Sequence, residues 1–188
     1  MLICCEGEKT EPGYFRDLRR DRRISALVAV VPPDVGTDPK SVVECAVQKM
    51  ADARRDKIPY TEVWCVFDMD GHAGVPEAFD RASARRISVA FSNPCFELWY
   101  LLHFEYSTAQ RSGPQVRQRL RDEYIPAYEK STRVYDNLAC LQQRACAHAA
   151  RLRRYHEELG QADTGNPSTG VDKLVDSLDR LARSVDTI

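Results

Sequence analysis

The sequence has no apolar run of about 18 residues, which is the length that a membrane-spanning helix needs. It shows no secretory signal pattern near its start, so we expect a cytoplasmic protein without a membrane partner. It also has little net charge, -1 over 188 residues. No global electrostatic field therefore indicates a nucleic-acid partner, and such a partner would have to bind a local basic patch.

Cysteine pairs at metal-binding spacing are absent as well. The seven cysteines form no CxxC motif, and their number is odd. Cys4, Cys65 and Cys95 lie inside apolar runs. A disulfide framework and a thiolate zinc site are therefore disfavoured, and we expect reduced, buried thiols.

The chain does contain a regular alternation of apolar and amphipathic segments. Four apolar runs predict strands at residues 2–5, 26–31, 63–67 and 87–91. Helical patterns follow each run, at residues 10–18, 39–56, 76–84 and 94–102. Thr10 and Asn93 stand where helix caps are expected. This order predicts an α/β fold, with a mostly parallel sheet and helices on both faces.

The strand signal disappears after about residue 105. The remainder is polar, rich in arginine and helical in pattern, and it is interrupted near Gly113-Pro114 and Pro126. We expect two or three helices there, with a long one near residues 134–159 and a last one that starts near Ser168. The predicted organisation is an α/β core of residues 1–105 and a C-terminal helical extension of residues 106–188 that packs on the core.

Acidic residues follow two of the predicted strands. Glu6 comes after the first strand, and Asp68 and Asp70 come after the third. Because ligands of parallel α/β sheets bind at the carboxyl ends of the strands, these acids are candidates for one magnesium or manganese site. Acids in such positions are also common as helix caps and solvated turn residues, and the Asp-x-Asp spacing alone leaves both interpretations open.

Four motifs in order resemble the RloB family, which is associated with bacterial restriction and phage-defence loci. They are EGEKTEPGYF, VFDMDG, SNPCFELWYLLHFE and NPSTGVDKLV. The resemblance implies a Toprim-like catalytic core. In it Glu6 matches a glutamate that binds metal or acts as general acid or base, Asp68 and Asp70 match metal ligands, and Glu11 matches a second acid. It further implies a magnesium- or manganese-dependent endonuclease in antiphage defence. RNA, such as tRNA, is favoured over DNA as its substrate, although no residue pattern separates the two.

Other polar residues are weaker candidates for the same site. Lys9 shares a loop with Glu6 and could meet the scissile phosphate. Asn93 could bind phosphate at a helix start, and Glu97 is either a structural ion pair or a site residue. His103 is either a core-edge histidine or a general acid that contacts phosphate. Arg16 belongs to a basic cluster that is either solvated or a substrate-binding surface.

Two other classes of function remain open. The first is a non-catalytic sensor subunit that keeps the fold and binds a nucleotide or a protein of a defence system. The second is a phosphoryl-transfer enzyme acting on small molecules, which is disfavoured because Cys-Glu-Gly follows the first strand where such enzymes place a nucleophilic Asp. A homo-oligomer or a defence-system partner is compatible with each of these.

Overall fold

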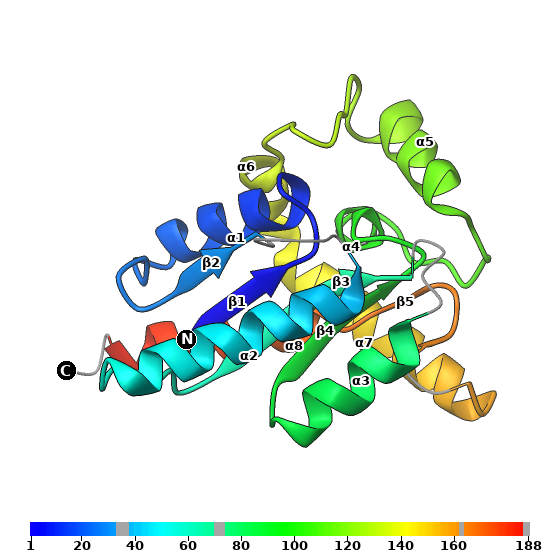
Figure 1. Cartoon of the computed structure of the whole chain (residues 1–188). Helices are drawn as coiled ribbons and strands as arrows, with labels where there is room; N and C mark the ends of the chain where they lie inside the picture. The colour runs from blue at the N-terminus through cyan, green and yellow to red at the C-terminus, as the bar shows by residue number, and fades with distance from the viewer. Residues whose placement is uncertain (33–37, 70–73, 162–163, 186–188) are drawn as a thin grey trace.

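A computed structural model describes residues 1–32, 38–69, 74–161 and 164–185 of the chain. Its central layer is a five-stranded sheet with strand order β2-β1-β3-β4-β5 (Figure 1). The first four strands are parallel, and β5 runs antiparallel to β4. Their bounds are Leu2–Cys5 for β1, Ala29–Val31 for β2, Val63–Asp68 for β3, Ser88–Asn93 for β4 and Ser168–Thr169 for β5. The predicted mostly parallel α/β fold is confirmed.

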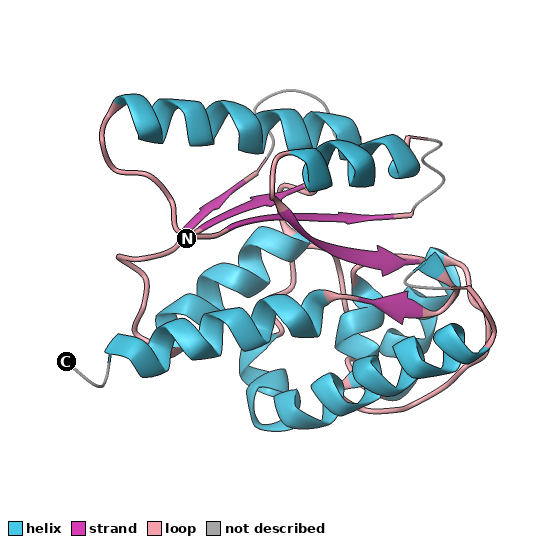
Figure 2. Ribbon diagram, turned by 90° about the horizontal axis from the view of Figure 1, so that it is seen from below, coloured by secondary structure: helices cyan, strands magenta, loops and turns pink. Residues whose placement is uncertain are grey.

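Helices cover both faces of the sheet, as Figure 2 shows. One face carries α2 and α3, and the other carries the remaining long helices together with α4. The bounds are Thr10–Asp21 for α1, Pro39–Arg55 for α2, Val75–Ala84 for α3, Glu97–Leu102 for α4, Gln142–Glu158 for α7 and Val171–Val185 for α8. Leu2 and Cys4 pack in the core on the face that carries α2 and α3, whereas Ile3 and Cys5 pack in the core on the opposite face. A strand buried on both faces needs apolar residues at every position, which explains the continuous run in β1.

The C-terminal part differs from its prediction in two ways. The predicted helix at 134–159 is divided into α6 (Tyr135–Leu138), a 3-10 turn (Ala139–Leu141) and α7. The last helix begins at Val171, three residues after the predicted Ser168, because Ser168 and Thr169 form β5. The Thr169 hydroxyl lies 2.8 Å from that of Ser92 on β4, so a polar side-chain pair helps to join this strand to the sheet. The extension also contains α5 (Gly113–Glu123).

Both predicted helix caps are wrong. β5 pairs with β4 as far as Asn93, so Asn93 is a strand residue and α4 begins four residues later, at Glu97. The N-cap of α1 is Lys9, and the Thr10 hydroxyl donates instead to the Lys130 carbonyl oxygen at 3.0 Å. In both cases the side chain donates a hydrogen bond to a carbonyl oxygen of a segment far away in the sequence, instead of accepting one from the start of the helix.

The seven cysteines are free thiols, and Cys4, Cys65 and Cys95 are buried as predicted. Cys140 is exposed and departs from that pattern. Burial raises the pKa of the Cys95 thiol well above its ordinary value, so this thiol is unsuited to act as a nucleophile. Within the ranges that the structure describes, no helix is long and apolar enough to cross a membrane.

Candidate active site

The order in which the chain adds strands to the sheet changes sides between β1 and β3. β1 leads through α1 to β2 on one side, and β3 pairs with β1 on the other. Because α1 and α3 lie on opposite faces, the connections that leave the carboxyl ends of β1 and β3 separate there. Such a switch point is where open α/β sheets bind their ligands.

A cavity of about 340 Å³ lies at this switch point. The described residues that line it come from the end of β1, the start of α1, the end of β3, the start of α4 and one segment of the extension. They are Glu6, Gly7, Glu8, Lys9, Thr10, Glu11, Asp68, Phe96, Glu97 and Lys130. The lining therefore combines five carboxylates with two lysines.

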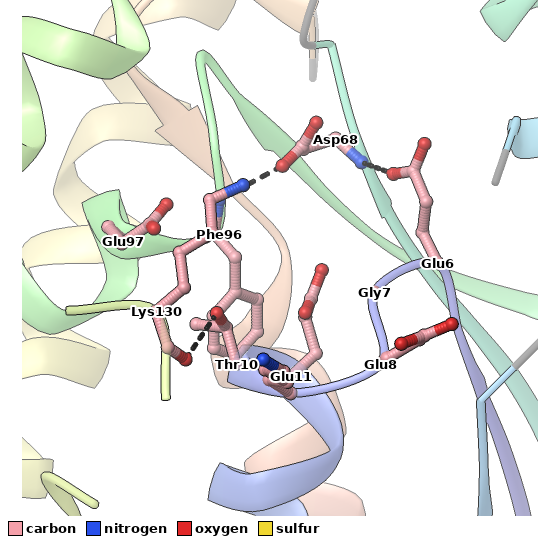
Figure 3. Close-up of a pocket in the computed structure, with 10 residues that line it drawn as sticks. Glu6, Gly7, Glu8, Thr10, Glu11, Asp68, Phe96, Glu97 and Lys130 are labelled. Carbon is pink, nitrogen blue, oxygen red and sulfur yellow. Dashed lines mark hydrogen bonds between the residues drawn. The ribbon is translucent and has the colours of Figure 1, made fainter. Parts of the chain in front are cut away.

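Backbone groups hold the two central carboxylates in place (Figure 3). The Asp68 N–H donates to Glu6 Oε2 at 3.0 Å, and the Phe96 N–H donates to Asp68 Oδ2 at 3.3 Å. The Glu6 N–H in turn donates to the Val66 carbonyl oxygen at 2.9 Å. Glu6 is only 7% exposed. Since these contacts join three segments, the predicted convergence of Glu6 and Asp68 is present in the structure.

Glu11 is the third acid of the cavity, and it lies in the first turn of α1. Its side chain is buried, and burial is the main cause that raises the pKa of this carboxyl. The charge of Glu97 acts in the same direction. Hydrogen bonds from the backbone of Glu11 and Gly7, and the charge of Lys130, oppose it. The cavity thus holds a carboxyl group with a raised pKa, as sites of acid–base chemistry often do.

The pKa of Glu11 makes its stability contribution dependent on pH. The folded-state pKa of Glu11 lies above the ordinary value of about 4.3, so the ionised carboxylate opposes folding. This penalty grows as pH rises above the ordinary pKa, and it is absent at pH values below it. Glu11→Gln is therefore expected to gain stability relative to the wild type as pH rises from about 4 to 7. Denaturant unfolding over a pH series measures this difference. A difference that stays constant or falls with rising pH would contradict the assignment.

Gly7 is required by the position of Glu11. A Cβ atom at Gly7 would collide with Glu11 Oε2, whereas a Cβ atom at Gly13 meets nothing within 4 Å. We expect Gly7→Ala to displace the Glu11 carboxylate and to lower about 100-fold the rate of any reaction that depends on this carboxylate, the effect typical of a displacement of about 1 Å in an active site.

The matched control for this change is Gly13→Ala, on the helix that carries Glu11, which should keep full activity and add roughly 0.5–1 kcal/mol of stability. Rates and unfolding free energies of the two variants give the comparison. Equal activity of Gly7→Ala and Gly13→Ala would show that the Glu11 position does not matter.

The remaining predicted residues divide into two groups. Lys9 lines the cavity and is exposed, and Glu97 lines it with only 3% exposure. Glu97 accepts a hydrogen bond from the Tyr128 hydroxyl at 3.3 Å and lies 3.8 Å from the Arg117 guanidinium. The two interpretations of Glu97 are thus compatible, because it is both ion-paired and part of the cavity wall.

Three other candidates lie outside the set of described residues that line the cavity. Arg16 is exposed on α1, and the Asn93 amide donates to the Thr164 carbonyl oxygen at 2.7 Å. His103 is fully buried, with Nδ1 2.9 Å from the Trp99 carbonyl oxygen. Burial lowers the pKa of His103 to about 4, so its ring is neutral at pH 7. These placements weigh against direct roles, and Asp70 lies outside the described residues.

Lys130 and Thr10 are site residues that sequence reasoning missed. Lys130 stands in the extension, more than a hundred residues from Glu11, and no local pattern marks it. Only the folded arrangement brings it to the cavity.

The side chains of the cavity can be compared with the ligands that the predicted divalent cation prefers. Carboxylate oxygens are the ligands that magnesium and manganese prefer, and Glu6 and Asp68 present such groups side by side. Among the described residues, no group of three or more His, Cys, Asp or Glu side chains could hold a metal ion by itself. The residues present fit the cation in chemistry and supply two of its three predicted ligands.

These observations define an α/β protein with an acidic cavity at the switch point of a mostly parallel sheet. The chain belongs to the RloB family, because the model of the RloB-like protein family matches residues 1–178. The match includes every described residue of the cavity. No curated protein matched the chain, and no solved structure did either.

Proposed function

We propose that this RloB-family protein is a magnesium- or manganese-dependent nuclease that hydrolyses phosphodiester bonds in antiphage defence. The observation that carries the proposal is the pairing of Glu6 and Asp68 in one cavity at the switch point. The family resemblance supports a Toprim-like reading of this pair. RNA, such as tRNA, is the preferred substrate class on the same ground.

The residues of the cavity suit distinct parts of this reaction. When bound, the cation would activate a water and stabilise charge on the departing oxygen. Glu6 and Asp68 would hold it, and Glu6 would also accept a proton from the attacking water. Glu11 would complete the acidic cluster, and the exposed Lys9 would face the phosphate. The backbone hydrogen bonds to Glu6 and Asp68 keep both carboxylates in position before substrate arrives.

A second candidate function is a non-catalytic sensor that binds a nucleotide or a protein of the defence system. It is favoured by one observation, namely that no group of three ligands among the described residues could hold a metal ion. A cavity with two fixed carboxylates and two lysines could also recognise a ligand without cleaving it.

One experiment separates the two functions. The purified chain is incubated with total RNA and with plasmid DNA, in magnesium, in manganese and in chelator. Asp68→Ala and Asp56→Ala are assayed in parallel, and the latter removes an exposed aspartate from the end of α2. We expect metal-dependent cleavage that is lost only in Asp68→Ala and in chelator. If no condition yields cleavage while nucleotides still bind, the sensor function replaces the nuclease.

A further inference from the structure

Residues 128–135 of the extension lie against the core next to the cavity. The Tyr128 hydroxyl donates to Glu97 Oε1 at 3.3 Å, which ties the segment to α4. The Arg133 guanidinium donates to both Asp17 oxygens, at 2.6 and 3.2 Å, which ties it to α1. The segment is therefore fixed to two helices of the core.

Lys130 lies between these two attachments. Its carbonyl oxygen accepts the Thr10 hydroxyl at 3.0 Å, so its backbone is held at the start of α1. Its side chain is exposed and lines the cavity. Figure 3 shows Lys130 and Thr10 on one side of the cavity, with Glu6 and Asp68 on the other.

The cavity has more acidic than basic side chains. Five of its lining residues are acidic and two are lysines. A phosphodiester is an anion, and carboxylates alone would repel it. Lys9 and Lys130 come from different segments, on the α1 loop and the extension, so they can contact the phosphate from two directions.

We propose that Lys130 is a substrate-binding residue whose ammonium group contacts a phosphate oxygen of a single-stranded nucleic acid at the cavity, an assignment that rests on the proposed nuclease function. A role limited to neutralising the acids is the structural alternative. Exposed ion pairs of this kind add little stability, so such a role gives no strong reason for a lysine here. An exposed, hydrated ammonium on a fixed backbone is well suited to a mobile phosphate group.

The salt dependence of binding tests the proposal without using activity. A short fluorescein-labelled single-stranded RNA, and DNA of the same sequence, are titrated with the full chain at several salt concentrations in calcium. Gel electrophoresis verifies that the probe stays intact. Each phosphate contact to a single strand contributes about 0.7 to the slope of log affinity against log salt concentration. We expect Lys130→Met to flatten that slope by about 0.7 and Lys130→Arg to restore it.

Lys57→Met is the matched control, because Lys57 is an exposed lysine that follows α2. Its slope should equal that of the wild type. If the wild type binds and Lys130→Met keeps the full slope, the role of Lys130 is overturned while the nuclease proposal stands. If the wild type binds neither RNA nor DNA, both proposals are overturned. A change of slope with DNA but not RNA supports Lys130 and corrects the substrate class.

Discussion

Glu6→Gln is expected to lower the rate of metal-dependent cleavage at least about 100-fold while the protein stays folded. The amide oxygen of glutamine can still accept the Asp68 N–H, so the 3.0 Å hydrogen bond that joins β1 to β3 is retained. What is lost is the negative charge that would hold the cation and the basic oxygen that would accept a proton. Substitution of groups that only support metal ligands costs about 10–100-fold, so loss of a ligand should cost at least the upper value.

The measurement is the initial cleavage rate as a function of metal concentration, with Glu158→Gln as control. Glu158 is an exposed residue at the end of α7, and its variant should keep the wild-type rate. Higher metal concentration should recover part of the activity if Glu6 acts mainly as a ligand. A Glu6→Gln enzyme with the wild-type rate would remove Glu6 from the mechanism.

Arg153→Ala is expected to lower the free energy of unfolding by about 3–5 kcal/mol, the usual effect of removing one partner of a buried ion pair. Arg153 on α7 donates to both Asp172 oxygens, at 2.6 and 2.7 Å, and to the Thr169 carbonyl oxygen on β5, at 3.1 Å. The two side chains are only 15% and 5% exposed. The substitution leaves the Asp172 charge buried without this bidentate partner, which is the costly part.

The double variant Arg153→Met, Asp172→Leu is the informative comparison. It removes both charges and fills the space with apolar atoms, so its loss of stability should be smaller than that of Arg153→Ala. Urea unfolding of the single and double variants measures the difference. A double variant less stable than the single one would mean that the pair itself, rather than the unpaired charge, determines stability.

The strands could be predicted where burial on both faces of the sheet restricts them to apolar residues. β1 and β3 are covered on both faces, so apolar residues occupy nearly every position and mark the strands in the sequence. β5 was missed because it has two polar residues, Ser168 and Thr169, and owes its position to pairing with β4. The helix at 134–159 was predicted as continuous because residues on both sides of the break are helical in composition.

The site was predictable only where strand order determines it. Glu6 and Asp68 follow neighbouring parallel strands, so a sheet of this class must bring them to one edge. Their role as metal ligands, and the role of Glu11 as a second acid, stay predictions. Lys130 depends on contacts between segments far apart in the sequence, which no local pattern encodes. His103 is the opposite case: it lies within the motif SNPCFELWYLLHFE and was a candidate general acid, but its side chain packs into the core.

The order of β4 and β5 has a consequence for how the extension is attached. Helices α4 to α7 form one long connection between these two adjacent strands, so the extension is anchored to the sheet at both ends. A fragment that stopped at residue 105 would leave β4 as an open edge, which is a template for aggregation. The segment with Lys130 belongs to that connection, whereas Glu6 and Asp68 stand at the ends of β1 and β3. The proposed binding of substrate and the proposed cleavage therefore rest on different parts of the fold.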